Sequence, residues 1–191
     1  MTRHPTRAPV LAVLLVLLLP AAPRVFGQNP AHPLMPPDRS TPRATLRTFL
    51  ESTDALLTFA RDEYLPAPTR AKFHHLVPLI ESNLQNFDLS ALAPVSRSRL
   101  ARSAATALYE TLARIELPPW DEVPGSEQLA TLRGDPPQWT IPNTEITLVR
   151  VRGGPHGDVF LFSTETVARA GEFYRRVQNL PYRRAVPIEG W

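Results

Sequence analysis

The sequence predicts an α+β fold, in which N-terminal helices are followed by a small antiparallel hairpin sheet and a C-terminal helix. Amphipathic helical patterns fill much of residues 42 to 115. Short runs of β-branched and aromatic residues, divided by a glycine-rich turn, fill residues 144 to 162. A further amphipathic pattern follows directly. The chain has 191 residues, a length that suits one domain with a sizeable core.

Residues 1 to 27 have the pattern of a secretory signal peptide. Arg3 and Arg7 give a positive start, Val10 to Leu19 is apolar, and Val25 to Gly27 suits the cleavage positions. The apolar run is short for crossing a bilayer core of about 30 Å, so a cleaved signal is favoured and an uncleaved membrane anchor is the alternative. We therefore expect export to the periplasm, at the outer face of the inner membrane.

The positive charge of the chain is concentrated in this signal. The formal net charge is +3, but Arg3, Arg7 and Arg24 lie in the first 27 residues, which contain no acid. The rest of the chain has 18 basic and 18 acidic residues. Nucleic-acid binding needs a concentrated basic face, so we expect no nucleic-acid partner. The lack of cysteine excludes disulfides, cysteine nucleophiles and thiolate metal sites.

The first helix is predicted to follow a linker. Residues 28 to 41 are rich in proline and polar residues, which indicates an extended segment. Thr41 is a suitable cap and Pro42 a suitable first helical residue. Pro66 and Pro68 end the helix, because residues before proline avoid the helical region. Its apolar stripe is formed by Leu46, Phe49, Leu50, Thr53, Leu56, Leu57 and Ala60.

Two further helices are predicted. Residues 70 to 86 have a helical pattern, but Pro78 is expected to kink or split that helix. Residues 88 to 94 form a turn, and residues 94 to 115 form the third helix. In it, Glu110 precedes Arg114 by four residues, the favourable order for an ion pair. Its apolar stripe consists of Leu100, Ala104, Leu108, Leu112 and Ile115.

The C-terminal third contains the predicted sheet. Residues 121 to 137 read as a loop with one short segment at 127 to 133, and residues 138 to 141 could form a strand. Residues 144 to 152 and 158 to 162 are predicted strands of a hairpin, with Gly153 to Gly157 as its loop. Ser163 is predicted to cap the last helix. An apolar stripe on that helix can cover the hairpin and contains Val167, Ala170, Tyr174 and Val177.

These one-sided apolar surfaces are unstable alone, so we expect them to share one core. The residues predicted to meet there are Leu46, Phe49, Leu50, Leu56 and Leu57 of the first helix, Leu100, Leu108, Leu112 and Ile115 of the third, and Ile146, Leu148, Phe160 and Phe162 of the hairpin.

No histidine, glycine-rich or serine pattern in the chain predicts a catalytic or cofactor-binding site. His74 and His75 would point about 100° apart on a helix, so they cannot readily bind one metal. Gly153 to Gly157 leads into a strand and lacks lysine, unlike a phosphate-binding loop. Ser126 and Ser163 lack the setting of a serine nucleophile. The remaining histidines lie in the predicted signal, linker and turn, at His4, His32 and His156.

Charged and aromatic clusters are likewise interpreted as structural or solvated. The acidic residues Glu116, Asp121 and Glu122 lack the alternating spacing of a calcium loop. The arginine pairs at 175 to 176 and 183 to 184 could face anionic lipid headgroups, or could simply be solvated. Tryptophans beside loops more often fill the hydrophobic core than bind a ligand. The tryptophans in such positions are Trp120, Trp139 and Trp191. We therefore predict no catalytic residue, cofactor or metal, and no enzyme activity.

Five segments, in order and in approximate spacing, resemble the extracytoplasmic N-terminal region of long bacterial MscS-like (small-conductance-type) mechanosensitive channels. The resemblance runs from about residue 40 to residue 182, and none of its motifs is catalytic. The segments are PRATLRTFLE (Pro42 to Glu51), FDLSAL (Phe87 to Leu92), IPNTEI (Ile141 to Ile146), FLFSTETV (Phe160 to Val167) and LPY (Leu180 to Tyr182).

The resemblance implies a non-catalytic periplasmic domain at residues 42 to 182. Residues 183 to 191 would be a tail, or the start of a linker to a membrane region that this chain does not contain. The partner would be that transmembrane channel portion or a co-encoded membrane protein, through which the module would form a homo-oligomer. The pattern of residues 64 to 84 is more broken by proline than that of the family, so the resemblance does not by itself predict the second helix.

A second interpretation is a stand-alone exported NTF2-like domain that binds a small molecule. The Thr-Pro helix start followed by helices and a final sheet also looks like the opening of such domains. They need a strongly curved sheet with more strands than the sequence predicts. Two or three strands would favour the channel-associated module, and four or more around a polar pocket would favour the binder.

Overall fold

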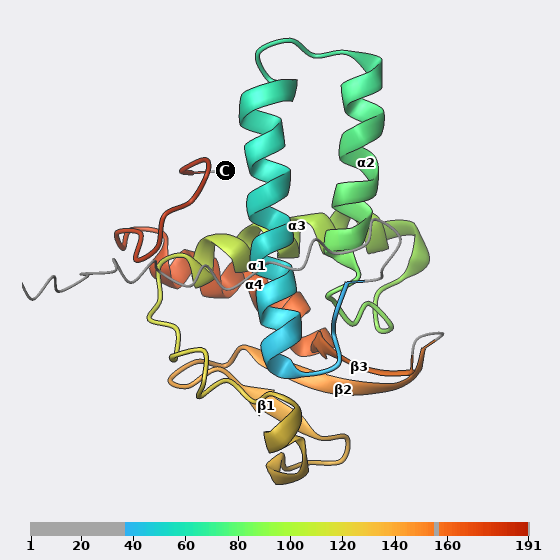
Figure 1. Ribbon diagram of the computed structural model, residues 1–191, viewed down its shortest axis with the longest axis vertical. Coiled ribbons are helices and arrows are strands. Elements are labelled where there is room, and N and C mark those ends of the chain that lie inside the picture. Colours follow the sequence, from blue (N-terminus) through green and yellow to red (C-terminus); the bar gives the residue numbers. More distant parts are fainter. Residues whose placement is uncertain (1–36, 155–156, 191) are drawn as a thin grey trace, which may run out of the picture. The chain divides into compact units, whose positions relative to one another are not determined.

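The computed structural model describes residues 37 to 154 and 157 to 190 (Figure 1). The predicted signal and most of the predicted linker lie outside the described residues. The predicted α+β class is confirmed, because the described residues form helices, a three-stranded antiparallel sheet and a last helix after the sheet. In chain order the elements are α1 (Pro42–Phe59), the π-helix η1 (Ala60–Tyr64), α2 (Arg70–Leu84), α3 (Pro94–Leu112), the 3₁₀-helix η2 (Ser126–Thr131), β1 (Gln138–Thr140), β2 (Thr147–Gly154), β3 (Gly157–Phe162) and α4 (Thr164–Val177).

α1 and α2 form a helical hairpin, and α3 and α4 run crosswise to it in the view of Figure 1. α1 begins at the predicted cap, because the Thr41 hydroxyl accepts a hydrogen bond from the Ala44 amide at 3.0 Å. A π-helical turn follows α1, in which the Leu65 amide donates to the Ala60 carbonyl at 2.8 Å. α2 continues through Pro78 as one helix, so the proline does not split it.

The sheet has the order β1-β2-β3, with Leu148 of β2 paired to Trp139 and to Phe162. The predicted bounds of the hairpin were wrong at both ends of β2. β2 starts at Thr147, and it runs to Gly154, which pairs with Gly157 inside the stretch predicted as loop. Glycine lacks a side chain but keeps both ladder groups, so it can extend the strand pairing into the turn.

Residues 141 to 146 form the turn from β1 to β2, which is why β2 begins later than predicted. The Ile141 amide donates to the Ile146 carbonyl at 2.9 Å, and the Thr144 amide donates to the Ile141 carbonyl at 3.1 Å. Asn143 has a φ of +60°. Asparagine tolerates this left-handed conformation better than most residues do.

The outer edge of β3 is occupied by two segments from the N-terminal half of the chain. The Phe160 amide donates to the Arg39 carbonyl at 2.7 Å, and the Phe162 amide donates to the Asn86 carbonyl at 2.9 Å. The Phe162 carbonyl in turn accepts from the Asp88 amide at 2.9 Å. These bonds join the segment before α1 and the segment after α2 to the sheet.

One hydrophobic core contains most of the predicted residues. Leu100 is an exception, because it is 38% exposed, and burial on α3 begins only at Ala101. The first turns of α3 therefore extend beyond the packed region. On α4 the most buried stripe is Val167, Ala170 and Phe173, and the predicted Tyr174 is half-buried beside it. Buried members from the three predicted stripes are Leu46, Phe49, Leu50, Leu57, Leu108, Leu112, Ile146, Leu148 and Phe162.

Among the described residues, none of the helices combines the length and the apolar composition needed to cross a membrane. The part of the chain that the structure describes contains three strands.

Candidate functional site

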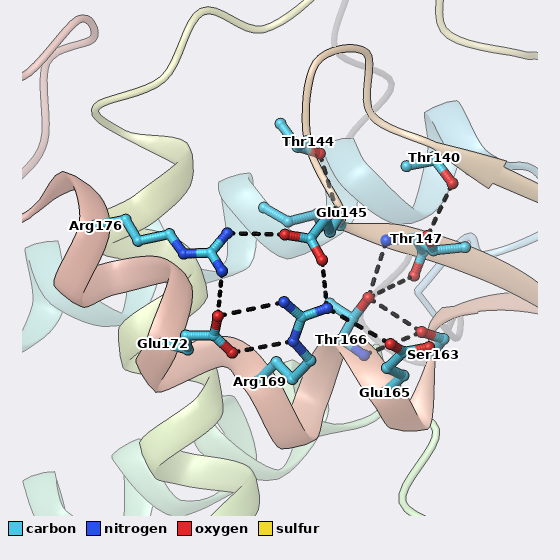
Figure 2. Close-up of polar contacts among 11 residues, drawn as sticks. Thr140, Thr144, Glu145, Thr147, Ser163, Glu165, Thr166, Arg169, Glu172 and Arg176 are labelled. Atoms are coloured by element: carbon cyan, nitrogen blue, oxygen red, sulfur yellow. Dashed lines mark hydrogen bonds and ion pairs between the residues drawn. The ribbon is translucent and has the colours of Figure 1, made fainter.

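The largest ionic network among the described residues joins α4 to the turn between β1 and β2 (Figure 2). The Glu145 carboxylate lies between two guanidinium groups of α4. It pairs with Arg169, and it accepts a hydrogen bond from Arg176 at 2.8 Å. Glu172 bridges the same two arginines, with 3.1 Å between its Oε2 and the Nε of Arg169. Glu165 adds a longer contact to Arg169 at 3.5 Å.

The network favours the ionised forms of Glu145 and Glu172. Hydrogen bonds from Arg169 and Arg176 lower the pKa of the Glu145 carboxyl, and the hydrogen bond from Arg169 lowers the pKa of Glu172. Because these pKa values are lower in the folded state, the pairs stabilise the domain at pH values above the unfolded-state pKa of glutamate, about 4.3. This contribution is lost as the pH falls through the folded-state pKa values. The side chains are partly exposed, so salt screens the pairs.

The N-terminus of α4 is fixed to β2 beside this network. The Ser163 hydroxyl accepts from the Thr166 amide at 3.1 Å, which confirms the predicted cap. The Thr166 hydroxyl accepts from the Thr147 amide at 2.9 Å, so the first turn of α4 is tied to the start of β2. Ser163 is thus engaged in capping and strand attachment rather than placed as a nucleophile.

A polar hollow of about 480 Å³ lies next to these contacts and includes Asp88, Glu145, Glu165 and Arg169 in its wall. Arg169 pairs with both glutamates. The wall carries three carboxylates and one guanidinium, so it is acidic overall, and the contacts of Arg169 hold the 141 to 146 turn against α4.

A second polar cluster holds the segment after α4 against α3. Glu110 and Arg114 form a buried ion pair, with side chains 1% and 6% exposed. The Tyr182 hydroxyl donates to Glu110 at 2.8 Å, and the Arg114 guanidinium lies 3.9 Å from the centre of the Tyr182 ring. The Gly190 amide donates to the same hydroxyl at 2.7 Å. The ion pair predicted from helical spacing is thus the anchor of the C-terminal segment.

A third cluster holds the same segment against α1. The buried Tyr109 hydroxyl donates to Asp54, and Arg184 bonds to both carboxylate oxygens of Asp54 at 3.1 and 3.2 Å. The Arg184 guanidinium also lies 4.7 Å from the centre of the Tyr109 ring. Residues 183 to 190, predicted as a tail, are therefore attached to the helices on both sides. Arg61 extends this attachment by donating to the Pro187 carbonyl at 3.0 Å.

The stability of the domain is expected to fall as the pH rises above about 10, the unperturbed value of tyrosine. Burial raises the pKa of Tyr109, as does its hydrogen bond to Asp54, and burial also raises the pKa of Tyr182. When the pKa of a tyrosine is higher in the folded state than in the unfolded state, its contribution to stability is complete below the unfolded-state pKa. That contribution is lost as the pH rises towards the folded-state pKa. Thermal unfolding between pH 8 and 11.5 measures this loss, and the double variant Tyr109→Phe/Tyr182→Phe should show a flatter profile. An unchanged alkaline loss in that variant would contradict the assignment.

His74 and His75 of α2 lie beside different neighbours. His74 accepts a hydrogen bond from Arg70 at 3.2 Å, whereas the His75 ring lies 4.6 Å from the Phe59 ring, so the two histidines face different neighbours. No group of three or more potential metal ligands occurs among residues 37 to 154 and 157 to 190. The exposed residues Asp121 and Glu122 lie in a loop.

Of the paired arginines and the tryptophans discussed in the sequence analysis, some contact the rest of the protein and others are exposed to solvent. Arg176 and Arg184 belong to the clusters above, whereas Arg175 is exposed. Trp139 packs against the core, and Trp120 is 41% exposed beneath the guanidinium of Arg47. His4, His32, His156 and Trp191 lie outside the described residues.

Sequence reasoning missed several members of these clusters. Glu165 and Arg169, and also Glu172 and Arg176, stand four residues apart on α4, a spacing that could have predicted the helical part of the network. Glu145, Asp54 and Tyr182 carry no such signal, because their partners are distant in the sequence.

No protein-family model matches this chain, and searches of curated proteins and of solved structures find no match.

Proposed function

We propose that this chain is a non-catalytic periplasmic module of a mechanosensitive-channel-type membrane protein. It acts as a binding or assembly element at the outer face of the inner membrane, and the pore belongs to a transmembrane partner portion. The proposal rests on the resemblance of five short segments to the extracytoplasmic region of MscS-like channels. The observation that supports it best is the way those segments meet in the fold.

Three of the five segments meet in one aromatic cluster. Phe49, Phe87 and Phe162 each come from a different segment, and their ring centres are 5.2 to 5.5 Å apart. The cluster joins α1, the segment after α2 and β3, so short motifs far apart in the sequence pack together. A fold shared with the channel family would bring its motifs into contact in this way.

The other two segments are attached to the same domain by polar contacts. Ile141 and Ile146 are buried in the core, and Glu145 between them in sequence pairs with α4. Tyr182 of the last segment bonds to the buried Glu110. The segment after α4 is therefore held at a defined place on the helices. A module that acts on a membrane partner through this segment would need such a fixed attachment.

Export is the first test of this proposal. The full chain, produced with its own N-terminus in a bacterium, is expected to reach the periplasm and to lose residues 1 to 27, because those residues have the pattern of a cleavable signal. Intact mass should place the mature start at Gln28 or within a few residues of it. Recovery of the full-length protein from the cytosol would contradict the proposal.

The second test measures channel gating. The full chain is expressed together with an MscS-like channel protein, and membrane patches from spheroplasts are pulled with and without the chain. We expect the tension at half-opening to shift, because a module that binds one gating state better changes the gating equilibrium. Arg99→Gln, an exposed change on α3, serves as the folded control and should act like the natural chain. Chemical cross-linking in the same membranes tests whether the chain contacts the channel. If the chain neither cross-links to the channel nor shifts the tension, the proposal is overturned.

A further inference from the structure

An apolar hollow of about 220 Å³ lies between the helical hairpin and the middle of α3. Most of its lining side chains are aliphatic, and several of them are otherwise well buried. An apolar cavity of about 150 Å³ is large enough to hold benzene, so this hollow has room for a hydrocarbon group. Its main aliphatic residues are Leu56, Ala60, Leu76, Ile80 and Leu84.

The π-helical turn shapes one end of this hollow. Ala60, Tyr64 and Leu65 all line it, and the Leu65 amide donates to the Ala60 carbonyl five residues earlier. The wider turn of a π-helix places residues four and five positions apart on the same side. π-helical turns are rare and are often found at functional sites. Leu65 is 60% exposed, so an apolar side chain remains on the solvent side of the hollow.

The base of the hollow is fixed by hydrogen bonds. Asn83 of α2 donates to the hydroxyls of Thr53 at 2.7 Å and of Ser52 at 2.9 Å. The Thr53 hydroxyl donates to the Phe49 carbonyl at 2.7 Å. These contacts join α1 to α2 beneath the hollow. A ligand would therefore enter a preformed site, which reduces the entropy lost on binding.

A single charged residue lines the hollow, and it is basic. Arg102 of α3 is exposed and forms no ion pair with any residue that the structure describes. The sequence from residue 89 to residue 109 contains three arginines and no acid, so this stretch carries a net positive charge. An anionic group beside the apolar lining would find a free guanidinium.

We propose that this hollow binds an amphiphile with one unbranched hydrocarbon chain and an anionic head group. The chain lies among the aliphatic side chains of α1 and α2, and the head group pairs with Arg102. A free fatty acid and the acyl chain of an anionic membrane lipid share this chemistry. The inference does not depend on the proposed channel role, since it rests only on the lining of the hollow.

Dodecanoate, kept below its micelle concentration, is the probe for this site. Calorimetry and native mass spectrometry should show saturable binding of one molecule to the mature protein. Octanoate should bind more weakly, because each buried methylene contributes about fourfold in affinity. Dodecylammonium should bind more weakly than dodecanoate does. Failure of dodecanoate to saturate, or equal binding of the ammonium compound, would overturn the proposal.

Two variants locate the site. Arg102→Gln should weaken dodecanoate binding about three- to tenfold, whereas the matched control Arg99→Gln, on the same helix but outside the hollow, should not. Ala105→Phe should abolish binding by filling the hollow, with circular dichroism used to check its fold. If Ala105→Phe does not fold, the contrast between Arg102→Gln and Arg99→Gln still decides. Equal binding by these two arginine variants would overturn the assignment of the head group.

Vesicles distinguish the two sources of the ligand. Phosphatidylglycerol vesicles that bind the mature protein in an Arg102-dependent way would identify a membrane lipid. Binding of dodecanoate without such vesicle binding would identify a free fatty acid. Both results support the shared chemistry of an acyl chain with an anionic head group.

Discussion

Replacing Arg114 by Met is expected to destabilise the domain by about 3 to 5 kcal/mol. The substitution leaves the Glu110 carboxylate buried without its cation, since the side chains of the pair are only 1% and 6% exposed. It also removes the guanidinium 3.9 Å from the ring centre of Tyr182. Urea unfolding followed by circular dichroism measures the loss of free energy.

A surface ion pair provides the control for this prediction. Arg150 pairs with Asp158 at 3.0 Å, but both side chains are more than one-third exposed, so Arg150→Met should cost less than about 1 kcal/mol. The double variant Glu110→Leu/Arg114→Met should recover much of the lost stability, because it removes the buried charge together with its partner. Equal losses for Arg114→Met and Arg150→Met would contradict the role of burial.

Replacing Phe49 by Ala is expected to cost about 3 to 5 kcal/mol. Phe49 is fully buried, and its ring contacts Phe87 and Phe162 in edge-to-face geometry at 5.3 and 5.2 Å. The change removes these contacts and leaves a cavity where α1, α2 and β3 meet. Leu108→Ala, at a fully buried position of α3, should cost about 2 to 5 kcal/mol in the same urea experiment.

Phe73 provides a matched aromatic control on α2. Its side chain is 49% exposed, and its one aromatic neighbour among the described residues is the exposed His74. Phe73→Ala should therefore change the free energy of unfolding by a small fraction of the Phe49→Ala loss. Losses near zero at both Phe49 and Leu108 would mean that the helices do not share the core described above.

The helices could be predicted well because their signals are local. Thr41 and Ser163 cap the helices that the sequence assigns to them, and the apolar stripes repeat within a few turns. The bounds of β2 were predicted poorly for a physical reason. Strand ends depend on pairing partners, and here Asn143 supplies a turn that delays β2 until Thr147. β-branched composition alone does not mark where pairing begins.

The clusters of charged residues show the limit of sequence reasoning more clearly. The spacing of Glu110 and Arg114 predicts an ion pair, but spacing does not predict burial, which depends on Tyr182 far along the chain. Asp54 and Arg184 have the same character, because only the fold brings them together. The apolar hollow is formed by three separate helical segments, and no single stretch of sequence indicates it.

The hydrogen bonds along the outer edge of β3 limit how this protein can aggregate. A bare edge strand offers unpaired backbone groups to a strand of another molecule, which is how fibrils and strand-swapped dimers begin. Here the carbonyls of Arg39 and Asn86 already accept from β3. A second molecule that paired with β3 at Phe160 or Phe162 would have to displace these segments, and at the opposite edge β1 is only three residues long. The peptide that leads into α1 and the end of α2 thus protect the folded domain from intermolecular strand pairing.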